Sequence, residues 1–183
     1  INFSDGIKFS AVKSQTPSLL TINVPIGLQF GTNPGNIQVQ GSSLEVNPGQ
    51  TLALVGGNVQ VNGGQLLAPS GNVELGGMAD TSTVGLSING SSLGLSFPND
   101  VELADVSLRN GTDVNVIAGG GGSIAINARF LDMTGESTQL QSGIPSGLNS
   151  VDSQARDIEI NATEAINLNG SSISNRVQST AVG

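Results

Sequence analysis

The sequence contains no cysteine, histidine, tryptophan or tyrosine among its 183 residues. Without cysteine the protein cannot form a disulfide or a thiolate metal site, although this absence leaves the cellular compartment undecided. Without histidine it lacks the commonest general base and a frequent zinc ligand. These absences exclude every catalytic scheme that depends on a cysteine or a histidine.

Charge is also scarce. Charged residues are 11% of the chain, well below the roughly 25% of an average protein. The six basic residues are scattered singly from Lys8 to Arg176, and the formal net charge is −8. Because there is neither a basic patch nor an aromatic platform, we expect no nucleic acid partner.

Long apolar runs and a leader sequence are missing as well. The chain has no run of about 18 apolar residues, so we expect no membrane-spanning segment. The first residues, Ile1–Asp5, have neither the basic flank nor the apolar core of a signal peptide. If the protein is exported, we expect its signal peptide to lie outside this chain.

Glycine and short alternating runs are what the sequence has instead. Three Gly-Asn pairs, beginning at Gly35, Gly57 and Gly71, each open a run in which apolar residues occupy every second position. This is the side-chain period of a strand. The first two pairs lie 22 residues apart, which predicts a chain that winds and returns beside itself.

The rest of the chain extends this pattern. Ser123–Ala128 is repeated as Asp157–Ala162, and a loop that leaves the coil is predicted at 142–150, where Gly143, Pro145 and Gly147 occur. Little or no helix is expected, with only Val151–Arg156 compatible with one. Further strands are predicted at Gly6–Ala11, Leu19–Phe30, Val84–Ile88, Leu93–Phe97 and within 101–117.

The predicted fold is therefore all-β: a right-handed parallel β-helix, or β-solenoid, that occupies residues 1–183 as a single domain. At roughly 22 residues per rung the chain makes about eight rungs. The alternative all-β architecture is an antiparallel sandwich, which favours two-residue hairpins between paired strands. Similar peptides recur about a rung apart in this chain, and this favours the β-helix.

Two stretches carry a family resemblance: Leu-Glu-Val-Asn-Pro-Gly-Gln-Thr-Leu-Ala-Leu-Val-Gly-Gly at 44–57 and Leu-Ala-Pro-Ser-Gly-Asn-Val-Glu-Leu-Gly-Gly at 67–77. They resemble the filamentous-haemagglutinin-type exoproteins of cyanobacteria. Peptides at 104–111, 122–129 and 158–163 continue the resemblance over nearly the whole chain.

The resemblance implies a non-catalytic structural or adhesive segment of a secreted or cell-surface two-partner-secretion exoprotein. In that family the amino-terminal domain is a right-handed β-helix recognised by an outer-membrane transporter, and repeats follow it. The Asn-Pro-Asn-type motifs near the start of the family's secretion domain are absent. The chain therefore looks like the later part of that domain, a fragment of a longer protein. Glycans and cell surfaces are the candidate adhesive targets, and the sequence does not choose between them.

The rival interpretation is a polysaccharide-binding or polysaccharide-degrading β-helix protein. The acidic cluster that would serve it is Asp100, Glu102 and Asp105, of which the first two are expected to share an outer strand face. A glycosidase needs two positioned carboxylates, and Ca²⁺ needs several further oxygen ligands. A solvated strand face explains the cluster equally well, so we assign no catalytic, cofactor-binding or metal-binding residue and no cofactor.

The glycine run at 119–122 superficially resembles a phosphate-binding loop. It lacks the Lys-Ser/Thr of a phosphate-binding loop and precedes a predicted strand rather than a helix. We therefore interpret it as a tight connection.

Arginine spacing adds a prediction about stacking. Arg109, Arg129, Arg156 and Arg176 are separated by 20, 27 and 20 residues. Two of these intervals are close to one rung, so at least one neighbouring pair, 109/129 or 156/176, is expected at equivalent corners of the coil.

The two ends of the coil add a prediction about association. The terminal rungs of a β-helix expose unpaired backbone groups, which predicts end-to-end self-association. Lys8 and Lys13 oppose pairing at the first rung, whereas 164–183 offers only Arg176. The carboxy-terminal end is therefore the expected site of association.

Overall fold

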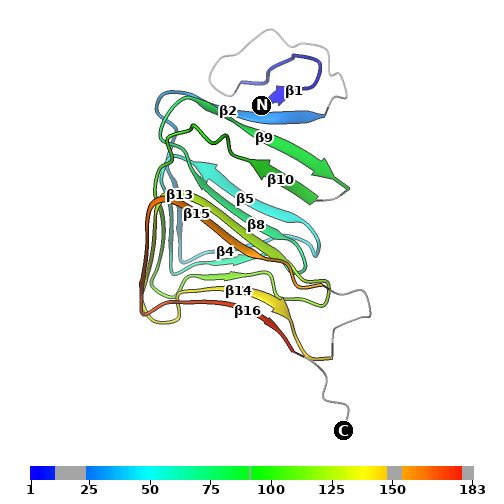
Figure 1. Cartoon of the computed structure of the whole chain (residues 1–183), viewed down its shortest axis with the longest axis vertical. Coiled ribbons are helices and arrows are strands. Elements are labelled where there is room, and N and C mark those ends of the chain that lie inside the picture. Colours follow the sequence, from blue (N-terminus) through cyan, green and yellow to red (C-terminus); the bar gives the residue numbers. More distant parts are fainter. Residues whose placement is uncertain (11–23, 91, 148–153, 179–183) are drawn as a thin grey trace.

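The computed structural model describes residues 1–10, 24–90, 92–147 and 154–178 (Figure 1). Over these residues all the regular secondary structure is β-strand, as the sequence predicts, and the strands form three sheets. In this described part of the chain no helix is long and apolar enough to span a membrane.

One sheet is antiparallel and has the strand order β1-β2-β9-β10. It lies at one end of the molecule, at the top of Figure 1. Its strands are β1 (Asn2–Phe3), β2 (Pro25–Phe30), β9 (Ser82–Asn89) and β10 (Ser92–Ser96).

The other two sheets are parallel, and we call them together the parallel stack. The larger contains β3 (Ile37–Gln40), β5 (Thr51–Gly56), β6 (Val59–Asn62), β8 (Asn72–Gly77), β11 (Val106–Arg109), β13 (Ser123–Thr134) and β15 (Ile158–Asn169). The smaller contains β4 (Ser43–Glu45), β7 (Gln65–Leu67), β12 (Asp113–Asn115), β14 (Gln139–Ile144) and β16 (Ser172–Val177).

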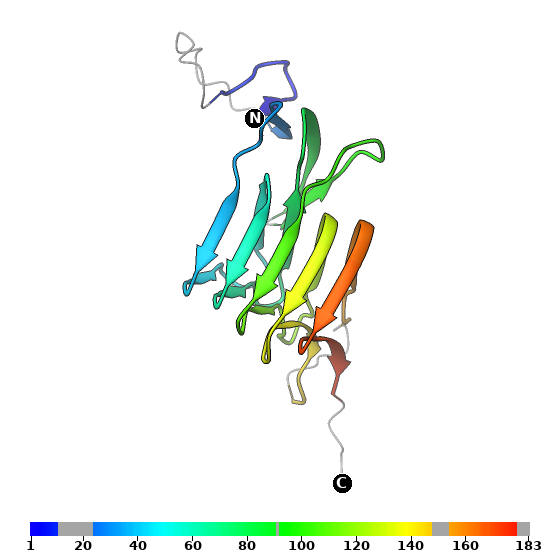
Figure 2. The ribbon, with the colours of Figure 1, turned by 90° about the vertical axis from the view of Figure 1, so that its left-hand side faces the viewer.

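The chain passes through the parallel stack in repeated circuits. The first circuit is β3, β4 and β5, and the second, β6, β7 and β8, pairs with it strand by strand. Ile37 is aligned with Val59, so the 22-residue spacing of the first two Gly-Asn pairs does mark one circuit. β13 and β15 are long enough to contribute to two faces each. Figure 2 shows one face as parallel arrows in chain order, from blue to orange.

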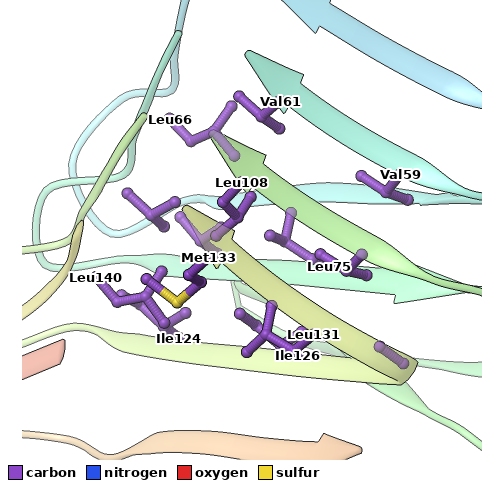
Figure 3. Packing of buried hydrophobic residues seen from close by; sticks show 14 of the residues in the cluster. Val59, Val61, Leu66, Leu75, Leu108, Ile124, Ile126, Leu131, Met133 and Leu140 are labelled. Atoms are coloured by element: carbon purple, nitrogen blue, oxygen red, sulfur yellow. The ribbon is translucent and has the colours of Figure 1, made fainter. Parts of the chain in front are cut away.

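Inward-facing side chains form one continuous core (Figure 3). Val59, Val106 and Leu131 are aligned on consecutive strands, and each is fully buried. The next inward column is Val61, Leu108 and Met133, which are also buried. Fully burying such a side chain contributes about 1.5–3 kcal/mol. The alternation seen in the sequence exists because successive side chains of each strand point alternately into this core and away from it.

Residues 79–105 interrupt the stack between β8 and β11 and carry the hairpin of β9 and β10. The free edge of β10 is bonded to side chains that project from β5 and β8. Thr51 Oγ1 donates to the Leu93 carbonyl at 2.8 Å and accepts from the Leu93 N–H at 3.0 Å, while the Glu74 carboxylate accepts from the Leu95 N–H at 3.1 Å. A small apolar cluster lies alongside and includes Met78, Val84 and Leu103. The antiparallel sheet is thus fixed to the outside of the stack.

The prediction of about eight rungs is not confirmed. The smaller parallel sheet has five strands, so the stack has five levels in the described part of the chain. The prediction assumed that the whole chain winds the coil, whereas β1, β2, β9 and β10 pair antiparallel. The Asn89-Gly90 turn, with Gly90 at φ +63°, closes a hairpin there.

Local predictions differ from the structure in three places. The predicted strand at Gly6–Ala11 appears only as a bridge between Lys8 and Asn2, while residues 11–23 lie outside the described residues. β14 continues to Ile144, so the first residues of the predicted loop at 142–150 belong to a strand. Of the helix considered at Val151–Arg156, residues 151–153 are likewise outside the description and 154–156 are not helical.

Gly143 belongs to β14, although the sequence predicts a loop from residue 142 onward. It is aligned with Arg176, and a Cβ at position 143 would lie 2.0 Å from the Arg176 carbonyl oxygen. Its φ is +134°, a conformation that favours glycine. The glycine therefore permits a close approach of two strands and does not mark a turn.

Candidate ligand-binding groove

Polar side chains cover the outer side of β6 and β11. The inward positions of these strands are valine and leucine, so the residues between and beside them point outward. The register aligns Gln60 with Ser107 and Asn62 with Arg109. We call this surface the polar face; its members are Asn58, Gln60, Asn62, Asp105, Ser107 and Arg109.

A groove of about 290 Å³ runs over the polar face and is lined by its six members together with Val61. The lining offers amide, hydroxyl, carboxylate and guanidinium groups, and hence both hydrogen-bond donors and acceptors. The groups repeat from strand to strand at the spacing of a parallel sheet, about 4.8 Å. Such a surface is suited to an extended ligand that carries many hydroxyl groups.

Asparagine ladders hold the polar face in place. Asn36 Oδ1 accepts a hydrogen bond from the Asn58 N–H at 2.9 Å, and Asn58 Oδ1 accepts one from the Asp105 N–H at 3.0 Å. At the other end of the strands, Asn110 Nδ2 donates to Asn62 Oδ1 at 2.7 Å. In each of the first two Gly-Asn pairs, the asparagine side chain therefore accepts a hydrogen bond from a backbone N–H of the next circuit.

Two ion pairs connect β13 with β11 and with Asp105, the residue that precedes β11. Arg129 donates to both carboxylate oxygens of Asp105 at 2.9 Å, and Arg109 pairs with Asp132. The hydrogen bond from Arg129 lowers the pKa of the Asp105 carboxyl, and Asp105 in turn raises the pKa of Arg129. Asp105 is thus held as a carboxylate whose negative charge is compensated by the guanidinium of Arg129.

The acidic cluster proposed from the sequence is divided by the structure. Asp100 and Glu102 are exposed in the segment that leads out of the hairpin, while the intervening Val101 packs against the small apolar cluster. Asp105 lies on the polar face and is paired with Arg129. Over the described residues, no three acidic side chains are grouped closely enough to hold a metal ion.

The glycine run at 119–122 lies between levels of the stack. Gly120 donates its N–H to Ser70 Oγ at 3.0 Å, and Gly121 has φ +66°. A Cβ at Gly121 would lie 2.2 Å from the Gln154 carbonyl oxygen, and one at Gly122 would lie 2.6 Å from the Val116 side chain. The run is the tight connection that the sequence predicts, because backbone segments approach it from neighbouring circuits.

The prediction that neighbouring arginines occupy equivalent corners is wrong. Arg109 is aligned with Thr134, and Arg176 is aligned with Gly143. The intervals of 20 residues do not correspond to one circuit at these places. Arg109 instead pairs with Asp132 on β13, and Arg129 pairs with Asp105, which precedes β11, so the two arginines lie at opposite ends of the polar face.

The sequence carries a signal for the polar face in the polar residues that alternate with valine. Asn58, Gln60 and Asn62 alternate with valine in β6, as Gln38 and Gln40 do in β3. The pairing of Arg129 with Asp105 was not visible in the sequence, because it depends on the register between β11 and β13.

Comparison with known proteins gives one family match. The model described as the TPS secretion domain matches residues 1–126. No curated protein and no solved structure matches the chain. The matched range contains the antiparallel sheet and the polar face and ends within β13.

Proposed function

The chain belongs to the TPS secretion domain family, where TPS denotes two-partner secretion, and we propose that it is the export-directing and adhesive segment of a secreted exoprotein. Family membership makes it part of a two-partner-secretion exoprotein that interacts with a partner transporter. The match over residues 1–126 is the observation that carries the export-directing part of the proposal, since it covers more than half of the 183 residues.

The parallel stack supports the fold that this function requires. Its strands pair in parallel through five levels of the smaller sheet. Parallel crossover connections are right-handed in nearly all known cases. We therefore propose that the stack is a right-handed β-helix and that residues 1–183 form one domain.

The proposal gives the polar face a binding role without catalysis. Asp105 is paired with an arginine, and Asp100 and Glu102 lie outside the groove lining. Amide, hydroxyl and guanidinium groups in register suit hydrogen bonding to glycans. Adhesion to a glycan or to a cell surface is accordingly the proposed activity of this face.

Polysaccharide degradation is the second candidate function. The observation in its favour is the carboxylate of Asp105 within a groove. A glycosidase needs a second carboxylate that flanks the scissile bond, in the usual mechanism about 5–9.5 Å from the first. The groove lining holds one carboxylate only.

A glycan-binding screen with paired variants tests the adhesive role. Asn62→Ala and Arg109→Ala should each weaken binding to any glycan that the wild-type chain retains. Asn167→Ala is the matched control, because Asn167 lies in the same outward column as Ser107 but beyond the groove. Absence of binding to all glycans and cell surfaces would overturn the adhesive role. Polysaccharide cleavage that disappears in Asp105→Asn would establish the enzymatic alternative.

A further inference from the structure

The groove lies where the polar face carries its smallest side chain. The central outward column of the larger sheet consists of Gln38, Gln60, Ser107, Asp132 and Asn167, on β3, β6, β11, β13 and β15. Ser107 is the short member of this column and is half-buried between longer neighbours. The groove is therefore a hollow centred on Ser107, with Gln60 beside it.

The charges that border this hollow are compensated in pairs. Asp105 and Arg109 are the charged residues of the lining, two positions to either side of Ser107. Asp105 accepts two hydrogen bonds from Arg129, and Arg109 pairs with Asp132. Two carboxylates and two guanidiniums thus add up to no net charge, and neither sign dominates the groove.

The hydrogen-bonding groups left free at the centre of the groove are uncharged. The side chains of Gln60 and Ser107 form no hydrogen bond with any of the described residues. Asn58 and Asn62 use their Oδ1 atoms within the asparagine ladders, and this leaves their Nδ2 groups to donate. A ligand in the groove therefore meets amide and hydroxyl groups.

We propose that the polar face binds an uncharged polysaccharide, and that Gln60 and Ser107 make the central hydrogen bonds to its hydroxyl groups. This inference rests on the proposed function, because it assigns a class of glycan to the same groove. A sugar hydroxyl both donates and accepts, as the Gln60 amide and the Ser107 hydroxyl do. The amides from Asn58 to Asn62 span about 13 Å along β6, which suits a segment of an extended chain.

The same arrangement disfavours an acidic polysaccharide. Arg109 is the cation of the lining, and Asp132 already compensates its charge. An acidic group bound at Ser107 would lie near the carboxylates of Asp105 and Asp132, and like charges placed together are unfavourable. The net charge of −8 repels polyanions as well.

The test uses an array of neutral polysaccharides (glucans, mannans, galactans and xylans), each with its sulfated and its diethylaminoethyl derivative. Every backbone is thus present in an uncharged, an anionic and a cationic form. The full chain should bind at least one neutral member and bind its sulfated derivative at least about tenfold more weakly. Binding of the neutral member should change little with salt, since screening acts on charges.

Two variants test the central hydrogen bonds. Gln60→Ala and Ser107→Ala should each weaken binding of the neutral member by about two- to tenfold, the loss expected for one hydrogen bond. Gln65→Ala is the matched control, because Gln65 is also exposed but lies on β7 of the smaller sheet. It should bind like wild type.

A third variant gives a readout that loss of folding could not imitate. Asp132→Asn leaves the charge of Arg109 uncompensated, although Asp132 itself lies outside the lining. It should strengthen binding of the sulfated derivative and leave binding of the neutral member nearly unchanged. Asp113→Asn removes the same charge from β12 of the smaller sheet and should change neither.

Three results would contradict the proposal. If the wild-type chain binds no member of the array, the adhesive role fails together with the assigned class of glycan. If it binds a charged derivative as tightly as the neutral parent, and Gln60→Ala weakens that binding, the groove binds glycans but the class is wrong. If the folded Gln60→Ala and Ser107→Ala variants bind the neutral member like wild type, the adhesive role stands and its site lies elsewhere.

Discussion

Arg129 donates two hydrogen bonds to Asp105, with Nε–Oδ1 and Nη2–Oδ2 distances of 2.9 Å each. Both side chains remain more than a third exposed, so water screens the pair and we expect Asp105→Asn to cost little stability at neutral pH. A carboxyl whose pKa is lowered on folding stabilises the protein above its ordinary pKa, and this stabilisation is lost as the pH falls through the lowered pKa.

Urea unfolding checks this prediction. Between about pH 5 and pH 2, wild type should lose more stability than Asp105→Asn. An equal loss in both proteins would show that the ion pair does not contribute.

Glu74 should have the opposite dependence on pH. It is half-buried beneath β10, and burial raises the pKa of its carboxyl despite the hydrogen bond from the Leu95 N–H. A raised pKa gives a contribution that is full below the ordinary value of about 4.3 and is lost as the pH rises through the raised value. Glu74→Gln removes the buried charge and keeps an oxygen for Leu95, so it should raise the melting temperature at neutral pH.

The advantage of Glu74→Gln should shrink as the pH falls and wild-type Glu74 becomes protonated. Glu45→Gln, at an exposed position on β4, is the control and should leave the melting temperature at neutral pH nearly unchanged. A Glu74→Gln variant that is less stable than wild type at neutral pH would contradict the assignment.

The three Gly-Asn pairs predict different responses to the same substitution. A Cβ at Gly71 would lie 2.0 Å from the Gln50 carbonyl oxygen, and one at Gly57 would lie 2.5 Å from the Pro34 carbonyl oxygen. A Cβ at Gly35 would have no atom within 4 Å. Gly71→Ala and Gly57→Ala should therefore destabilise by about 1–3 kcal/mol, as overpacking does.

Gly35→Ala is the matched control. It should be neutral or stabilising by up to about 1 kcal/mol, because alanine restricts the unfolded chain. Denaturant midpoints measure all three variants. A loss at Gly35 as large as the loss at Gly71 would show that the circuits do not approach one another as described.

The last circuit of the described residues should support self-association, as the sequence predicts. Ile166 and Leu168 continue the buried columns of Leu131 and Met133 but are about half exposed. In sedimentation velocity we expect concentration-dependent association that disappears in Ile166→Ser/Leu168→Ser. A wild-type chain that stays monomeric at every concentration would refute this prediction. Of the two lysines expected to protect the other end, Lys8 lies beside β2 and Lys13 is outside the described residues.

Sequence reasoning succeeded where local pattern and tertiary contact agree. The alternation over 36–77 predicts the strands because valine and leucine in that stretch meet the same residue types one circuit away. It failed where similar turn sequences occur both in an antiparallel hairpin and between parallel strands of the stack. Gln40-Gly41, Asn89-Gly90 and Asn169-Gly170 look alike, and all three glycines have φ near +60°.

Only the second of these turns closes an antiparallel hairpin; the other two lie between consecutive parallel strands of the stack. The turn residues are the same, so the pairing partner decides the outcome, and that partner is not a local property. The contacts of the polar face could not be predicted from the sequence for the same reason. The sequence singles out Asp105 as part of an acidic cluster, but its partner Arg129 is brought to it only by the register of β11 and β13.

We propose that this chain directs export through a partner transporter. The most direct test of this proposal is the amount of the chain in the culture medium after delivery to the periplasm by a fused signal peptide, with and without the transporter of its own two-partner system. We expect the chain to reach the medium only when the transporter is present. Retention in the periplasm in both cultures would contradict it.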